Sequence, residues 1–180
     1  MSIKTNEIPV GVIGLALMGC SITTCLLMAG HPVVAIAPIS IDMTTAESRI
    51  RKHFVKAKEE GLVSKDPEFY FKNLIITEDY GALKPCKLAI ECTLESEEIK
   101  KVVYGKIEAV IAEDALMTSN TSAIPISILQ KMTKHPDRFF GLHWAEPSHT
   151  TRFLEVICGD QGDIAEGEYL YELSNYWNKE

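Results

Sequence analysis

The 180 residues of this chain are enough for one domain with its own hydrophobic core. Apolar residues make up 46% of the chain and charged residues 24%, which are ordinary values for a globular protein. Acidic residues outnumber basic residues by 25 to 18, so we expect no binding to nucleic acid or to an anionic membrane, which need cationic contacts. The cysteines form no C-x-x-C pair, which predicts a reducing, cytoplasmic setting and buried thiols at Cys20, Cys25, Cys86, Cys92 and Cys158.

The stretch from Ile8 to Ile41 contains no Asp, Glu, Lys or Arg and has the composition of a membrane span. We reject that interpretation because glycines and a proline, among them Gly14, Gly19 and Pro32, divide the stretch into short pieces. The pattern is typical of a strand over Val10 to Ile13, a helix over Met18 to Ala29 and a second strand over Val33 to Ala37, all buried.

Strands and helices continue to alternate through the rest of the chain. A long helix is expected from an N-cap at Asp42 to about Glu60, with Gly61 ending it and a basic, solvated face. Later helices are expected at 95–112, 126–132 and 164–177, and a loop or short helix at 65–72. Later strands are expected at 73–77, 87–92, 115–119, 139–143 and 153–158. This alternation predicts one α/β domain over residues 1–180, with a Rossmann-like, doubly wound, mostly parallel sheet between two helical layers in an α/β/α sandwich.

The sharpest local motif is Gly14-Leu15-Ala16-Leu17-Met18-Gly19, between the first strand and the first helix. In a dinucleotide-binding turn the first glycine permits the tight turn, the middle one lets the backbone approach a pyrophosphate, and the third lets helix and strand pack closely. The phosphates then lie at the helix N-terminus, where free N–H groups favour anions. Gly14, Ala16, Met18 and Gly19 are therefore candidate cofactor-binding positions, although Ala16 adds a methyl group where a glycine is usual.

A second feature of nucleotide-binding turns departs from the usual pattern. An acidic residue at the end of the second strand normally holds the ribose hydroxyls, and here that position is Ala37, followed by Pro38. No Arg stands at Ala37 to Ile39 to take a 2′-phosphate, which favours NAD over NADP.

Four further segments occur in a distinctive order: Ile90-Glu91-Cys92-Thr93-Leu94-Glu95, Ser119-Asn120-Thr121-Ser122, Gly141-Leu142-His143-Trp144-Ala145-Glu146-Pro147 and Leu154-Glu155-Val156-Ile157. In their order and spacing they resemble the NAD-binding domain of the L-3-hydroxyacyl-CoA dehydrogenases. The resemblance extends from about Val10 to the last helix.

The resemblance implies an oxidoreductase that transfers hydride from the 3-hydroxyl of an acyl-CoA to NAD. His143 would be the general base, Glu155 would orient its imidazole, and Ser122 would bond the substrate oxygen. Glu95, Lys100 and Asn120 match positions that contact the cofactor in that family. A neutral His beside a carboxylate is also a suitable base on chemical grounds. We find no metal-ligand spacing among the remaining histidines.

Two departures from the family keep alternatives open. Glu146 stands where the family has Asn, and the family's helical C-terminal domain, which closes the site and mediates dimerisation, is absent from this chain. We therefore expect this chain alone to bind the cofactor but to turn over little substrate. The sequence leaves open whether the chain forms a homodimer. The alternatives are a non-catalytic dinucleotide-binding or interaction module of the same fold, or another 3-hydroxyacid dehydrogenase, such as one resembling the NADP-using 6-phosphogluconate dehydrogenases.

Overall fold

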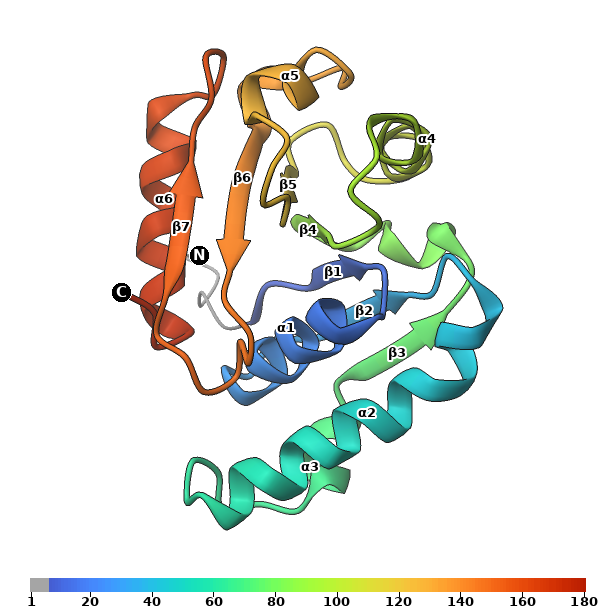
Figure 1. The fold of residues 1–180 in the computed structure, drawn as a ribbon, viewed down its shortest axis with the longest axis vertical. Coiled ribbons are helices and arrows are strands. Elements are labelled where there is room, and N and C mark those ends of the chain that lie inside the picture. Colours follow the sequence, from blue (N-terminus) through green and yellow to red (C-terminus); the bar gives the residue numbers. More distant parts are fainter. Residues whose placement is uncertain (1–6) are drawn as a thin grey trace.

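A computed structural model describes residues 7–180, which form one sheet of seven strands with helices on both faces (Figure 1). The strands are β1 Val10–Ile13, β2 Val33–Ile36, β3 Leu74–Thr77, β4 Leu88–Glu91, β5 Leu116–Ser119, β6 Phe139–Trp144 and β7 Leu154–Ile157. Their order across the sheet is β3-β2-β1-β4-β5-β6-β7. All neighbours pair in parallel except β6 and β7, which pair antiparallel. The predicted Rossmann-like fold is confirmed, because its strand order is 3-2-1-4-5-6.

Two apolar cores cover the two faces of this sheet. The helices are α1 Leu17–Met28, α2 Ser40–Glu59, α3 Pro67–Phe71, α4 Glu97–Glu108, α5 Ile126–Gln130 and α6 Ile164–Tyr176. One core joins the sheet to α1, α2 and α6, and the other joins it to α4, α5 and a short 3-10 turn at Tyr80–Leu83. The predicted three-layer arrangement therefore follows from burial on both faces, which also explains the almost continuously apolar strands.

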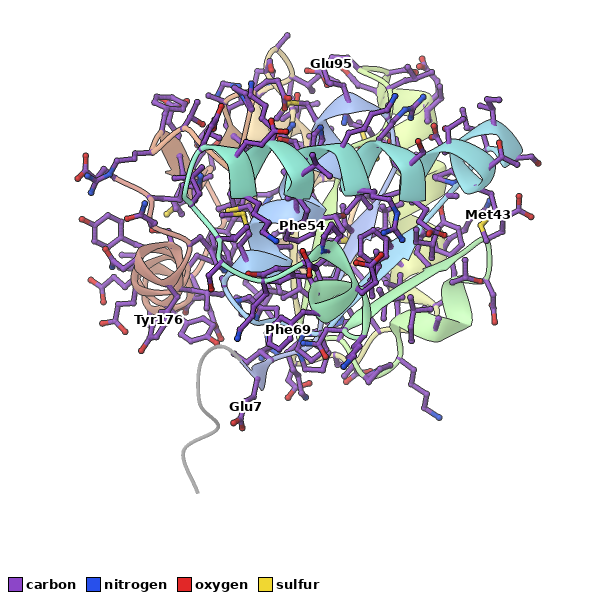
Figure 2. The ribbon with its side chains drawn as sticks, turned by 90° about the horizontal axis from the view of Figure 1, so that it is seen from below. Glu7, Met43, Phe54, Phe69, Glu95 and Tyr176 are labelled. Atoms are coloured by element: carbon purple, nitrogen blue, oxygen red, sulfur yellow. The ribbon has the colours of Figure 1, made fainter. Side chains whose placement is uncertain are left out.

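The longest helix shows how the sequence pattern fixes its position. In α2 the residues Ala46, Ile50, Phe54 and Ala57 are buried at helical spacing, and the rest of the helix is largely polar. Phe54 lies between α2 and α3 (Figure 2), with its ring stacked 4.4 Å from that of Tyr70. This aromatic contact packs α3 against α2.

Two local expectations are wrong. Asp42 does not cap α2, because the helix begins earlier, at Ser40, with Ile39 in the capping position. Asp42 instead lies buried in the first turn, where it accepts a hydrogen bond from Arg49 two turns later. Cys158 is exposed rather than buried, because it follows β7 at the edge of the sheet, and Cys92 is only half-buried.

The antiparallel pair at this edge has a register that matters for the site. His143 on β6 lies directly opposite Glu155 on β7. Residues that face each other in this way lie on the same side of the sheet, close enough for their side chains to interact.

Within residues 7–180, no helix is both long and apolar enough to cross a bilayer.

Candidate functional site

The predicted site residues gather at one edge of the sheet. Strands β1, β2, β4, β5 and β6 run parallel, so the turns that follow them lie at the same, carboxyl edge. Ligands of open α/β sheets bind at this edge, where the connections diverge to opposite faces. The glycine turn follows β1, Glu95 follows β4, and Asn120 and Ser122 follow β5.

The glycine turn has the close packing that its motif predicts. Gly14 has a φ of +96°, and a Cβ there would lie 2.7 Å from the carbonyl oxygen of Cys92. A Cβ on Gly19 would overlap the carbonyl oxygen of Gly14. Both positions therefore require glycine, and they set the N-terminus of α1 against the turn. Ala16 is exposed and precedes the first residue of α1, and Met18 is half-buried in its first turn. The turn therefore has the close packing of a dinucleotide-binding turn, with the Ala16 methyl on its surface, and phosphate binding there stays a prediction.

A buried charge cluster stands behind this edge. Glu91, the last residue of β4, and Lys100 of α4 have side chains that are 0% and 1% exposed, and the Lys100 ammonium lies 2.9 Å from both carboxylate oxygens. The carboxylate also accepts hydrogen bonds from Thr93, Tyr104 and Ser119. Burial and the neighbouring Glu91 charge raise the pKa of Tyr104, so the phenol stays a donor.

Lys100 also reaches toward Glu95, which organises the next turn. Its ammonium lies 3.5 Å from one oxygen of Glu95. The other oxygen of Glu95 accepts hydrogen bonds from Thr121 Oγ1 and from the backbone N–H groups of Ser122 and Ala123. Burial alone would raise the pKa of Glu95, but these hydrogen bonds and the charge of Lys100 outweigh burial and lower it. Glu95 therefore stays charged and holds the turn that carries Ser122.

Three side chains form a hydrogen-bonded line at the end of β6. The hydroxyl of Ser122 lies 3.2 Å from His143 Nε2, and His143 Nδ1 lies 2.7 Å from Glu155 Oε2. A carboxylate only accepts, so Nδ1 carries the hydrogen and Nε2 accepts from Ser122. The His143 side chain is 28% exposed, so part of the imidazole lies at the surface. Asn120 accepts a hydrogen bond from the backbone N–H of Trp144 and so joins the ends of β5 and β6.

The structure thus brings most of the predicted residues together, with Lys100 placed differently from the rest. Its side chain is buried and pairs with Glu91 and Glu95, so in the structure Lys100 contacts the residues that hold the site and not the site's surface. A direct contact between Lys100 and the cofactor stays a prediction. Trp144, the residue after His143, is a core residue, 2% exposed and packed against Trp177.

Sequence reasoning missed Arg49. Expected on a solvated helix face, it donates from Nη1 to the carbonyl oxygen of Leu15, inside the glycine turn, at 2.8 Å. A seven-residue spacing between Asp42 and Arg49 on one helix was the available signal, because it places both side chains on the same face.

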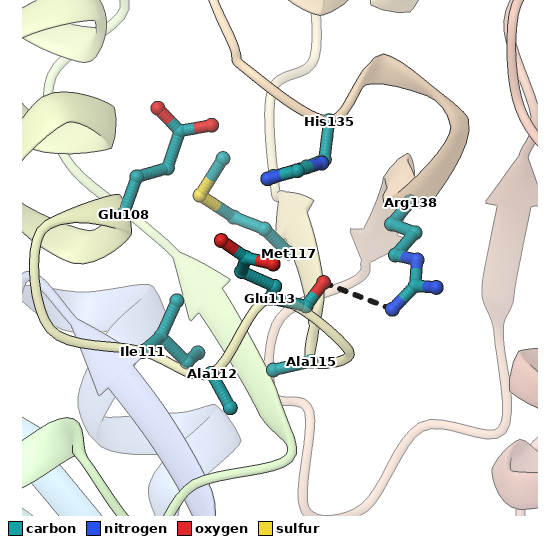
Figure 3. A pocket seen from close by; sticks show the side chains of 8 residues that line it. All are labelled: Glu108, Ile111, Ala112, Glu113, Ala115, Met117, His135 and Arg138. Carbon is teal, nitrogen blue, oxygen red and sulfur yellow. Dashed lines mark hydrogen bonds between the residues drawn. The ribbon is translucent and has the colours of Figure 1, made fainter.

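A separate small pocket lies at the opposite edge of the sheet, near the start of β5 (Figure 3). Its lining includes Glu108, Met117 and His135, and the side chain of Arg138 donates to the carbonyl oxygen of Glu113. Its volume of about 30 Å³ is enough for a few water molecules and too small for a nucleotide. Over residues 7–180 no three His, Cys, Asp or Glu side chains are grouped so that they could hold a metal ion.

Fold and glycine turn together define a dinucleotide-binding Rossmann domain. Comparison with known proteins agrees, since residues 9–180 match the family model described as 3-hydroxyacyl-CoA dehydrogenase, NAD binding domain. The chain is 32% identical over 155 residues to the 5-formyl-3-hydroxy-2-methylpyridine 4-carboxylate 5-dehydrogenase of Mesorhizobium japonicum, covering 84% of this chain and 49% of that protein.

Two solved structures illustrate the same likeness. FadB2 of M. tuberculosis superposes with a TM-score of 0.89 at 30% identity, covering 95% of this chain and 61% of that one. The 3-hydroxybutyryl-CoA dehydrogenase of Escherichia coli K12 superposes with a TM-score of 0.90 at 30% identity, covering 97% of this chain and 37% of that one. The chain therefore belongs to the family of NAD-binding domains of 3-hydroxyacyl-CoA dehydrogenases, and it spans about half the length of the curated relative, 49%.

Proposed function

We propose that this chain is the cofactor-binding part of an NAD-dependent dehydrogenase that oxidises the 3-hydroxyl of an acyl-CoA to a ketone. The observation that carries the proposal is the line from Ser122 through His143 to Glu155, at the sheet edge that also carries the glycine turn. The E. coli and M. tuberculosis relatives support it by their likeness, and the E. coli protein is titled a 3-hydroxybutyryl-CoA dehydrogenase.

Each of the three side chains has a defined task. A substrate hydroxyl that arrives at His143 Nε2 donates its proton there, and the Ser122 hydroxyl, displaced from Nε2, turns to hold the substrate oxygen. Glu155 keeps the imidazole in the correct tautomer through Nδ1 and balances the positive charge that His143 gains. Bound NAD would accept the hydride from the carbon that bears this hydroxyl. NAD would be held by the Gly14 turn, the start of α1 and the Glu95 and Asn120 positions.

The test separates binding from proton transfer. With protein in excess, oxidation of NADH by a 3-ketoacyl-CoA is followed by absorbance for the intact chain and for His143→Ala. We expect slow transfer in the chain and a loss of about 100-fold or more in His143→Ala, with NADH affinity by calorimetry unchanged. His135→Ala removes a histidine at the opposite edge and serves as the control that should leave the rate unchanged.

Transfer that does not depend on His143 would refute the proposed base. If NADH binds but no 3-ketoacyl-CoA is reduced, a non-catalytic dinucleotide-binding module becomes the better description; Ala37 and Glu146 are the observations that favour it.

A second candidate substrate class comes from the Mesorhizobium relative, which is named for a pyridine aldehyde rather than an acyl thioester. The Ser122, His143 and Glu155 line would serve this substrate as its hydrate, formed when water adds to the formyl carbon: one hydroxyl of the hydrate gives its proton to Nε2, hydride passes from the same carbon to NAD, and the product is the carboxylic acid. A parallel assay with that pyridine aldehyde and NAD distinguishes the two, since a faster reaction than with the acyl-CoA pair would reassign the substrate.

A further inference from the structure

The end of β2, where a ribose-binding acid is usual, carries no acidic residue. β2 ends at Ile36, and the next residues, Ala37 to Ser40, include no Asp or Glu. Ala37 is 1% exposed, and its N–H is bonded to the carbonyl oxygen of Thr77. An acid at this position would accept hydrogen bonds from the ribose hydroxyls and would repel a 2′-phosphate. Here neither the specific contact nor the repulsion exists.

A cation reaches the same turn from α2. Arg49 Nη1 donates to the Leu15 carbonyl oxygen at 2.8 Å and to Asp42 Oδ1 at 3.2 Å. These two contacts fix the guanidinium between the glycine turn and the first turn of α2, which follows the ribose-binding position of β2. The guanidinium has five N–H donors, and both of these hydrogen bonds use Nη1; the Cys20 thiol also lies close enough to interact with the guanidinium.

In the pair of Arg49 and Asp42, the cation lies nearer the surface than the carboxylate. The Arg49 side chain is 40% exposed, whereas the side chain of its partner Asp42 is 7% exposed. A ligand therefore meets the free edge of the guanidinium and not the carboxylate. A planar guanidinium held at a known position is well suited to a phosphate, because it can donate two parallel hydrogen bonds.

We propose that the dinucleotide site accepts NADP(H) as well as NAD(H), and that Arg49 is the residue that binds the 2′-phosphate. The missing acid at Ala37 removes the discrimination against that phosphate, and Arg49 adds an attraction to it. The inference concerns cofactor selection and goes beyond the proposed dehydrogenase activity, so it is tested by binding alone.

Calorimetric titration of the whole chain with NADH and with NADPH measures the selection directly. We expect dissociation constants within about ten-fold of each other. Arg49→Gln should weaken NADPH by about ten-fold or more and NADH by much less, because a charge-assisted contact to the 2′-phosphate exists with NADPH alone. Arg51→Gln is the matched control: it lies on the same helix and pairs with Glu47 and Glu68, and it should change neither affinity.

Ala37→Asp tests the same inference without touching Arg49. It should weaken NADPH and leave NADH equal or tighter, and circular dichroism of each variant confirms that it is folded. NADH binding about 100-fold tighter than NADPH, or an equal loss of both in Arg49→Gln, would overturn the inference while leaving the dehydrogenase proposal intact. Binding of neither nucleotide would overturn both.

Discussion

Replacing Lys100 by methionine removes the cation from a carboxylate that is fully buried. Met has a similar length and a similar helix propensity, so α4 itself should persist. Glu91 would keep its hydrogen bonds from Thr93, Ser119 and Tyr104, but no positive charge would remain in contact with it. We therefore expect the free energy of unfolding to fall by about 3 kcal/mol, at the lower end of the range for breaking a buried pair.

Urea unfolding followed by tryptophan fluorescence measures this loss, because Trp144 and Trp177 are both buried and will report the transition. Lys101→Met is the matched control, since Lys101 is the exposed neighbour on the same helix and its change should stay within about 0.5 kcal/mol. The double variant Lys100→Met with Glu91→Gln should recover part of the loss, because no unpaired charge remains. A loss below about 1 kcal/mol in Lys100→Met, or no recovery in the double variant, would refute the reasoning.

Two further predictions concern the glycine turn and a buried histidine. Gly19→Ala places a methyl group against the Gly14 carbonyl oxygen, so the turn must open, and we expect NADH affinity in calorimetry to fall by about ten-fold or more with the fold retained; unchanged affinity would show that the turn is not the phosphate site. Burial, with added repulsion from His53, Lys56 and Lys179, lowers the pKa of His149 from 6.5 to about 4, so the unfolded chain takes up the proton first. The free energy of unfolding should therefore fall by up to about 3 kcal/mol as pH falls from about 6.5 to 4. Urea unfolding across that pH range should show a smaller fall in His149→Gln than in the unsubstituted chain. A difference in stability between the chain and His149→Gln that stays constant with pH would contradict this prediction.

The fold could be predicted because local patterns carry it, whereas the roles of Ser122, His143 and Glu155 came from the resemblance to a family and stay predictions. Short apolar strands alternating with helices fix the layers, and the motif order placed His143 and Glu155 on adjacent strands before their pairing was visible. The antiparallel register of β6 and β7 then made them direct partners.

The supporting contacts could not be predicted, because they join residues that no periodic pattern relates. The Lys100 ammonium meets Glu91 only after α4 has packed on the sheet, and Arg49 meets Leu15 only after α2 has crossed α1. Asp42 has the residue type of a helix cap, yet the helix begins at Ser40, and Asp42 lies buried in its first turn with Arg49 as its hydrogen-bond donor. Such choices depend on tertiary packing and not on local propensity.

The cross-strand position of His143 and Glu155 separates changes that preserve their contact from changes that break it. Backbone hydrogen bonds between β6 and β7 set the distance between His143 and Glu155. The connection from Ala145 to Phe153 does not set this distance. A change in that connection would therefore alter the contacts of the buried Ser148 and His149 and the shape offered to a substrate, without changing the distance between His143 and Glu155. Only a shift of strand register, which would turn Glu155 to the other face of the sheet, would dismantle the pair.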